Sequence, residues 1–363
     1  MINYLTTLIS AAPKNLITYS EYMEATLYHP ELGYYMKNKE KIGRQGDFIT
    51  TSNISDIYGR ITAKWFAGIC LTNKLAPVFC EIGGGNGRFA HAFLQEWQET
   101  IKTPLTYIIV ESSAYHRELQ YELLKDVFSI VQVESLGELK AFDGMIFSNE
   151  LFDALPVHVI QKEHGQVFEI MVGIDNERLY EEKIPVTNQE LLSFLQVSGI
   201  ELKEKQRIEV PLTMGNMLEQ ISQSLTKGFV VTADYGYTNE EWKQPARASG
   251  SLRGYYQHKM ITDVLKYPGE MDITSHIHLD WLMQKGDTVG LKLFAKLRQD
   301  EFLVKAGILK ELENHYDPNP FSEVSKRNRA IRGLIMPSGI SSYFQIVIQQ
   351  KGLNVTQQNV FIE

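Results

Sequence analysis

The stretch "FCEIGGGNGRFAHAFL", residues 79–94, contains four glycines among the five residues 83–87. An apolar run typical of a short strand precedes these glycines, and a run typical of a helix follows them. Glycine weakens regular elements, so the cluster indicates a turn that requires bare backbone. A strand, a glycine-rich turn and a helix in succession form the arrangement that holds nucleotide-like ligands at the carboxyl end of a sheet.

The spacing of the glycines separates the ligand classes. A phosphate-binding loop requires G-x-x-x-x-G-K-[ST], which the chain lacks, and the dinucleotide pattern G-x-G-x-x-G fails because Arg88 stands at its last position. The stretch instead reads Glu81-x-Gly83-x-Gly85-x-Gly87. This form resembles motif I of class I S-adenosylmethionine (SAM) methyltransferases. The resemblance implies that the turn passes under the methionine and ribose of SAM and that Glu81 takes an ammonium or water contact. On this motif alone, a purely structural turn is the alternative.

Two further acidic residues follow apolar runs. Glu111 ends "TYIIVE", and an acidic residue at the end of the second strand can accept hydrogen bonds from both ribose hydroxyls. An exposed strand-end carboxylate is the alternative for Glu111 taken alone. Glu134 follows "FSIVQV", in the region where class I methyltransferases meet the adenine. We therefore expect both residues to bind the cofactor.

The segment "SNELFDALPV", residues 148–157, supplies the candidate catalytic residues. Asn149, Glu150 and Asp153 are expected to gather where the transferred methyl group emerges. The amide oxygen of Asn149 can accept from an amine or orient the cofactor, and the two carboxylates can accept from a cationic nitrogen. The alternative is a helix that begins here, with Asn149 as its N-cap and acidic residues in its first turn.

The pattern along the chain predicts an α/β fold. Strand-like and helix-like runs alternate from residue 77 to about 150, which is typical of a parallel sheet covered by helices. Residues 157 to about 210 indicate an antiparallel insertion that starts with two strands around the turn His164-Gly165, and "TVGLKLFAKL" and "FQIVIQQKGL" are expected to supply the last strands. The N-terminal part is predicted to be helical, with Ser20 as the N-cap of a helix that stops at His29-Pro30.

Together with this pattern, the resemblance of the glycine motif to class I methyltransferases implies a Rossmann-like class I methyltransferase sheet with a helical N-terminal extension and an antiparallel and helical insertion. Residues 1–75 are expected to form the N-terminal helical extension. Residues 76–156 and 212–363 are expected to form the SAM-binding core, and residues 157–211 an inserted subdomain on the substrate side.

Several motifs resemble the MidA-like class I methyltransferases, a family that includes the mitochondrial complex I assembly-factor arginine methyltransferase. They extend over most of the chain: "LYHPELGYY" (27–35), "GDFITTS" (46–52), "EIGGGNGR" (81–88), "NELFDALPV" (149–157), "GSLRGYYQH" (250–258) and "PGEMDITSH" (268–276). The resemblance places Asp47 and Thr50 in a loop over the cofactor, where Asp47 could bind its ammonium. Ser52-Asn53 departs from the proline and acidic residue common in the family, so the local charge differs from the family pattern.

The resemblance also places His258 and His276 near the active cleft. Either histidine could remove a proton late in the reaction, whereas a structural or surface role is the alternative for each. By resemblance, the cofactor is SAM, the product is S-adenosylhomocysteine, and the acceptor is an arginine side chain of a protein. A non-catalytic assembly or chaperone factor that retains the SAM-binding scaffold is the main rival, and a nicotinamide-dependent oxidoreductase is disfavoured by the missing dinucleotide pattern. A homodimer is compatible with the family.

Composition limits the binding partners, metal sites and cellular location that we expect. The 363 residues carry a formal net charge of −8, which argues against non-specific binding to nucleic acid or anionic membranes. The two cysteines, Cys70 and Cys80, form neither a disulfide framework nor a metal cluster, so we expect no metal site. The N-terminus lacks the arginine-rich pattern of a transit peptide, and we therefore expect a cytoplasmic protein.

Overall fold

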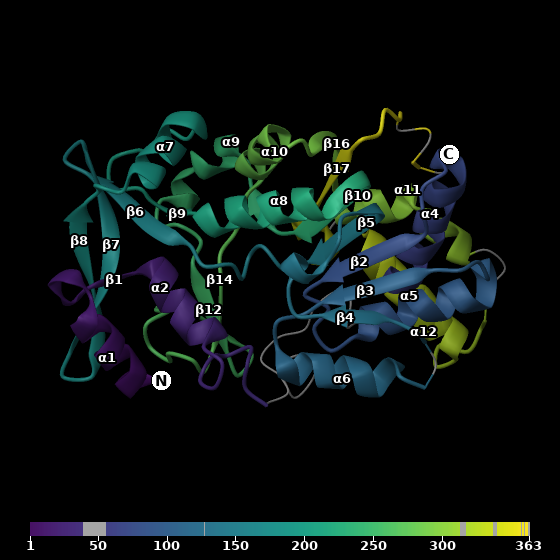
Figure 1. Ribbon diagram of the computed structural model, residues 1–363, viewed down its shortest axis with the longest axis horizontal. Coiled ribbons are helices and arrows are strands. Elements are labelled where there is room, and N and C mark those ends of the chain that lie inside the picture. Colours follow the sequence, from purple (N-terminus) through teal and green to yellow (C-terminus); the bar gives the residue numbers. More distant parts are fainter. Residues whose placement is uncertain are drawn as a thin grey trace. The chain divides into compact units, whose positions relative to one another are not determined.

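The computed structural model describes residues 1–38, 56–126, 128–312, 317–336, 340–356, 358, 360 and 361. The chain forms two compact units (Figure 1). Unit 1 comprises Met1–Phe48, Phe152–Leu218 and Gly236–Lys285, and unit 2 comprises Ile49–Leu151, Glu219–Tyr235 and Gly286–Glu363. None of the helices in the described ranges is long and apolar enough to cross a membrane.

Unit 2 contains a seven-stranded sheet in the order β16-β17-β10-β5-β2-β3-β4. The strands are β2 (Val78–Ile82), β3 (Thr106–Val110), β4 (Val131–Val133), β5 (Phe142–Asn149), β10 (Leu225–Asp234), β16 (Lys292–Arg298) and β17 (Gln345–Lys351). The five strands from β10 to β4 pair in parallel, whereas β17 pairs antiparallel with both β10 and β16. The strand order reverses between β2 and β5. This reversal creates the switch point at which open α/β sheets bind their ligands.

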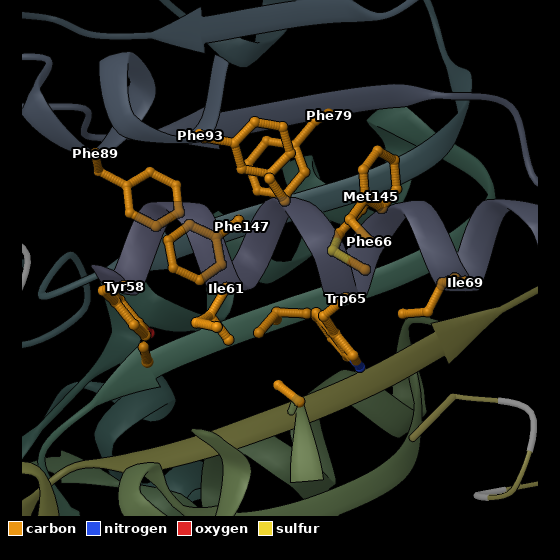
Figure 2. Packing of buried hydrophobic residues seen from close by; sticks show 14 of the residues in the cluster. Tyr58, Ile61, Trp65, Phe66, Ile69, Phe79, Phe89, Phe93, Met145 and Phe147 are labelled. Carbon is orange, nitrogen blue, oxygen red and sulfur yellow. The ribbon is translucent and has the colours of Figure 1, made fainter. Parts of the chain in front are cut away.

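An aromatic cluster holds helices against one face of this sheet (Figure 2). Its helices are α4 (Ile57–Asn73), α5 (Arg88–Glu96), α11 (Gln299–Lys305) and α12 (Glu323–Ile335), while α6 (Ala114–Leu124) follows β3. Phe79 of β2 and Phe147 of β5 are at most 1% exposed, and their ring centroids lie 5.8 Å apart. Phe89 of α5 stacks on Phe147 at 4.7 Å. Rings of this size bury enough apolar area to fix where α4 and α5 sit on the sheet.

Gly59 allows α4 to approach α5 closely. A Cβ atom at this position would lie 2.8 Å from the carbonyl oxygen of Phe89 and 2.9 Å from the Cβ atom of Ala92. Side-chain atoms do not tolerate such distances, so only glycine fits without moving one helix. The same helix contains Gly68, where a Cβ atom would meet nothing within 4 Å.

Unit 1 is built around a five-stranded antiparallel sheet in the order β1-β7-β6-β9, with β8 paired to β7. These strands are β1 (Ile17–Thr18), β6 (His158–Glu163), β7 (Gln166–Asp175), β8 (Arg178–Pro185) and β9 (Arg207–Val210). Two small sheets join β12 (Arg253–Tyr256) to β13 (Lys259–Ile261) and β14 (Asp272–Thr274), and β11 (Gly236–Tyr237) to β15 (Ile277–His278).

The described part of unit 1 contains the helices α1 (Ile2–Ala11), α2 (Tyr19–Met23), α7 (Gln189–Val197) and α9 (Asn239–Trp242), the π-helix η2 (Glu24–Tyr28), and the short 3-10 helices η1 (Pro13–Asn15) and η5 (Pro245–Arg247). Two further helices, α8 (Leu212–Ser224) and α10 (Leu279–Thr288), contain boundaries between the units. The expected N-cap at Ser20 is wrong. Thr18 caps α2, because its hydroxyl accepts from the Glu21 amide while the Glu21 carboxylate accepts from the Thr18 amide.

The predicted fold class is confirmed. β2, the helix that follows the glycines, β3 and β5 occupy the predicted alternating runs, and β16 and β17 are the predicted last strands. The antiparallel pair β6–β7 turns at His164 and Gly165, as expected.

Gly59→Ala tests the close approach of α4 and α5. We expect this substitution to lower the free energy of unfolding by about 1–3 kcal/mol, because the new methyl group forces the helices apart. Gly68→Ala is the matched control in the same helix and should raise stability by about 0.5–1 kcal/mol through helix propensity. Urea unfolding measures both, and equal effects of the two substitutions would contradict the close contact.

Candidate active site

The glycine turn adopts backbone angles that residues with a side chain rarely adopt. It joins β2 to α5, and Gly83, Gly85 and Gly87 all have positive φ angles, of 73°, 52° and 78°. A Cβ atom at Gly83 would lie 3.1 Å from Leu151, and one at Gly87 would lie 3.2 Å from Gln120. The turn therefore requires glycine for its conformation as well as for space.

Glu111 lies beside this turn, directly after β3. Its two carboxylate oxygens accept hydrogen bonds from the amides of Gly85 at 3.1 Å and Ser113 at 2.9 Å. The side chain is 7% exposed. Sequence reasoning predicted both Glu111 and the glycines, and the structure brings them together. A carboxylate has about four acceptor positions, so two remain for further donors.

Two residues that sequence reasoning missed support Glu111 and the turn. Gln120 of α6 is fully buried and donates from Nε2 to the carbonyl oxygen of Gly85 at 2.8 Å. Arg117 donates to the carbonyl oxygen of Glu111 at 2.8 Å. Gln120 had a detectable signal, because His116, Gln120 and Leu124 recur every four residues as the buried stripe of the helix, and an amide in such a stripe needs a polar partner.

Glu134 follows β4 and is exposed. Its carboxylate forms an ion pair with Arg117 at 3.3 Å. Arg117 thus connects Glu134 to the backbone of Glu111, although the carboxylate of Glu134 itself remains 65% exposed.

Glu81 is buried below the glycine turn. Its carboxylate accepts from the Tyr107 hydroxyl at 2.7 Å, on the sheet face that carries the aromatic cluster. Burial raises the pKa of Glu81 to about 7, which the Tyr107 hydrogen bond lowers in part and the nearby Glu111 carboxylate raises further. The hydrogen bond from Tyr107 thus occupies the Glu81 carboxylate, for which the sequence had predicted an ammonium or water contact.

Asn149 and Glu150 lie at the carboxyl end of β5. The side chains are joined by a 3.1 Å hydrogen bond from Asn149 Nδ2 to Glu150 Oε1, and the Glu150 amide donates to Ala233 at 2.9 Å. Glu150 has a φ of 50°, an unusual conformation for this residue type. Turns rather than a helix follow at residues 150–155, so the alternative of a helix capped by Asn149 is not found.

The remaining predicted catalytic residues belong to unit 1. Asp153 is 3% exposed, and its carbonyl oxygen accepts from the Ser275 amide. His276 stacks on Tyr237 at 4.3 Å and contacts the Arg253 guanidinium at 3.0 Å. His258 is exposed in the turn between β12 and β13.

The pKa of His276 is lowered to about 3, first by burial and then by Arg253 and Arg247. Such an imidazole is neutral at physiological pH and is a weak base, which does not favour a role as proton acceptor. Asp47 and Thr50, predicted to cover the cofactor, lie outside the described residues.

Comparison with known proteins identifies related sequences and structures. A family model described as "Putative S-adenosyl-L-methionine-dependent methyltransferase" matches residues 62–296. The chain is 26% identical to the human protein named protein arginine methyltransferase NDUFAF7, mitochondrial, over 88% of this chain and 76% of that protein. The mouse protein of the same name is 27% identical, over 80% of this chain and 71% of its own length.

A crystal structure from Burkholderia thailandensis, solved with S-adenosyl-homocysteine bound, superimposes with a TM-score of 0.89. It is 26% identical, and the match covers 98% of this chain and 92% of that one. The MidA-like family resemblance is thereby confirmed, and with it the SAM cofactor. The expectation of a cytoplasmic location is wrong by this comparison, because the curated relatives are named as mitochondrial proteins.

The described residues fit SAM. The glycine turn leaves the backbone bare beside Glu111, and Glu111 is fixed by backbone amides while two acceptor positions stay available. Two acceptors on one carboxylate suit the two adjacent hydroxyls of a ribose.

Glu111→Gln tests the ribose contact. We expect the dissociation constant for S-adenosylhomocysteine to rise about tenfold or more, because hydrogen bonds to a charged acceptor are lost. Calorimetric titration measures this change. Glu118→Gln, an exposed position on the adjoining helix α6, is the control and should bind as the wild type does. Equal affinity of all three proteins would contradict the assignment of Glu111.

Glu81→Gln tests the buried carboxyl group. Because the folded-state pKa of about 7 lies above the ordinary value of 4.5, the unfolded chain releases this proton first as the pH rises. The contribution of Glu81 to wild-type stability should therefore be greatest below pH 4.5 and should be lost as the pH rises to about 7, by on the order of 3 kcal/mol. Urea unfolding of the ligand-free protein at pH 5 and pH 8 should show that the variant lacks this loss. Parallel pH profiles of the unfolding free energy in the two proteins would contradict the raised pKa of Glu81.

Proposed function

Because this chain belongs to the family of S-adenosyl-L-methionine-dependent methyltransferases, we propose that it methylates an arginine side chain of a protein substrate. The observation that carries this proposal is the Asn149–Glu150 pair at the end of β5, on the strand next to the one that leads into the glycine turn. The names of the curated relatives support the choice of arginine as acceptor.

Glu150 is the central residue of the proposed chemistry. A guanidinium is fully protonated at neutral pH and carries only donors, so a carboxylate at this position would hold it and draw its charge away from the reacting nitrogen. Asn149 would accept from a second N–H group. When bound, SAM supplies an activated methyl group on a sulfonium sulfur. The acceptor nitrogen that takes the methyl group would release one proton to solvent water, and the sulfur would be left as a neutral thioether. The task of the protein is chiefly to position the acceptor, since the leaving group is already good.

The cofactor would be held by Gly83, Gly85 and Gly87 together with Glu111, with Glu134 at the adenine end. Asp153 belongs to unit 1, and this scheme gives it no step. His276 and His258 receive no step in this scheme, because the first is a weak base and the second is exposed.

Glu150→Gln tests the proposed function. With tritium-labelled SAM and proteins of the host cell, the wild type should produce methylarginine, identified by chromatography after hydrolysis of the labelled protein. The variant should turn over about a hundredfold more slowly or worse, because it lacks the charge that holds the guanidinium. Binding of S-adenosylhomocysteine should be retained.

Glu177→Gln is the matched control for this experiment. Glu177 has a similar left-handed backbone, with a φ of 63°, but is exposed in the turn between β7 and β8. Its variant should be as active as the wild type. Normal turnover by Glu150→Gln would remove Glu150 from the mechanism. Cofactor binding without any methyl transfer would instead favour a non-catalytic scaffold.

A further inference from the structure

The hydroxyl group of Tyr58 is buried without a hydrogen-bond partner. Tyr58 is 0% exposed, and its oxygen has no partner among the residues that the structure describes. Other buried tyrosines are paired: the Tyr22 hydroxyl donates to the carbonyl oxygen of Val264 at 2.8 Å, and the Tyr107 hydroxyl donates to Glu81. A buried polar group without a partner destabilises a folded protein, so the exception at Tyr58 calls for a physical reason.

The aromatic cluster places Tyr58 near the end of β5. Figure 2 shows its ring beside Phe147 and Phe89, and the ring centroids are 6.2 Å and 5.7 Å away. Side chains two residues apart in a strand share one face of the sheet, so Asn149 lies on the same face of β5 as Phe147. The close approach at Gly59 fixes this part of α4. Tyr58 therefore sits over the strand end that carries Asn149 and Glu150.

Charge and protonation agree with this placement. Burial and the carboxylate of Glu150 raise the pKa of Tyr58 well above its usual value. The hydroxyl is therefore protonated at physiological pH and can donate one hydrogen bond while its oxygen accepts another. All of these residues belong to unit 2.

A second unpaired oxygen lies at the same strand end. Asn149 uses its Nδ2 atom on Glu150, while its Oδ1 atom is buried and has no partner within the described part of the chain. Two unpaired buried oxygens at one site, next to a residue with strained backbone, indicate that the missing partner arrives from outside.

We propose that Tyr58 is a positioning residue for a nitrogen acceptor: once the acceptor is bound, the Tyr58 hydroxyl donates to Glu150, while its oxygen and Asn149 Oδ1 accept from N–H groups of the acceptor. This inference rests on the proposed methyl transfer and specifies the class of group that the site takes. A guanidinium or an amine brings several N–H donors. A carboxylate acceptor would bring only further acceptors to these oxygens, and its charge would be repelled by Glu150.

Tyr58→Phe and Tyr22→Phe form a matched pair of tests. Tyr58→Phe removes a hydroxyl that is unpaired in the free protein, so its thermal unfolding temperature should equal or exceed that of the wild type. In methyl transfer to host-cell proteins, its kcat should fall about tenfold or more, with the KM for SAM unchanged. Tyr22→Phe removes a paired hydroxyl in unit 1 and should do the reverse, with a lower unfolding temperature and an unchanged kcat.

Three results would overturn the inference. The first is a lower unfolding temperature of Tyr58→Phe, because the hydroxyl would then have a partner in the free protein; this measurement needs no acceptor. The second is an equal kcat of Tyr58→Phe and wild type. The third is a wild-type product methylated on a carboxylate or a thiol. A product methylated on an amine instead of arginine would contradict the proposed arginine acceptor while leaving the role of Tyr58 supported if its kcat falls.

Discussion

The parallel pairing of β2 with β5 is the constraint on which the rest of unit 2 depends. The register sets Glu81 opposite Phe147 and Ile82 opposite Ser148, so the two strands end at the same level of the sheet. Because the strand order reverses here, the connections that leave β2 and β5 run in opposite directions, which leaves room at the carboxyl edge of the sheet. The glycine turn leaves one strand and the Asn149–Glu150 pair ends the other. In the proposed function, the cofactor site and the acceptor site are adjacent because these two strands are neighbours.

The aromatic cluster converts this sheet edge into a rigid site. Phe79, Phe89 and Phe147 are closely packed, and α4 can join them only because Gly59 has no side chain. Close packing of this kind restricts side chains to single rotamers, and methyl transfer depends on position more than on strong acid–base groups. Core packing and catalysis thus impose the same requirement on this face of the sheet.

Much of this arrangement could be predicted because it is local in sequence. The glycine spacing and the acidic residue after the second strand identified the turn and Glu111, since each belongs to one strand–loop–helix unit. Contacts that cross the fold gave no such signal: Tyr58 resembles any aromatic residue of an amphipathic helix, and its missing partner is visible only in three dimensions. Thr18 was missed in favour of Ser20 because neighbouring hydroxyls compete for one helix start. The prediction of a cytoplasmic location was wrong because it rested on N-terminal composition, which is a weak guide compared with the curated relatives.

The division of unit 1 among three separate segments affects how the chain folds as it is synthesised. Strand β1 near the N-terminus pairs with β7, and Tyr22 bonds to Val264, more than 200 positions later. The apolar cluster that includes Leu5 and Tyr22 also contains Val264 and Met271, so it is complete only after the ribosome has made the last of the three segments. Until then, part of this apolar surface remains exposed in an unfinished chain. Exposed apolar surface promotes aggregation and is bound by molecular chaperones.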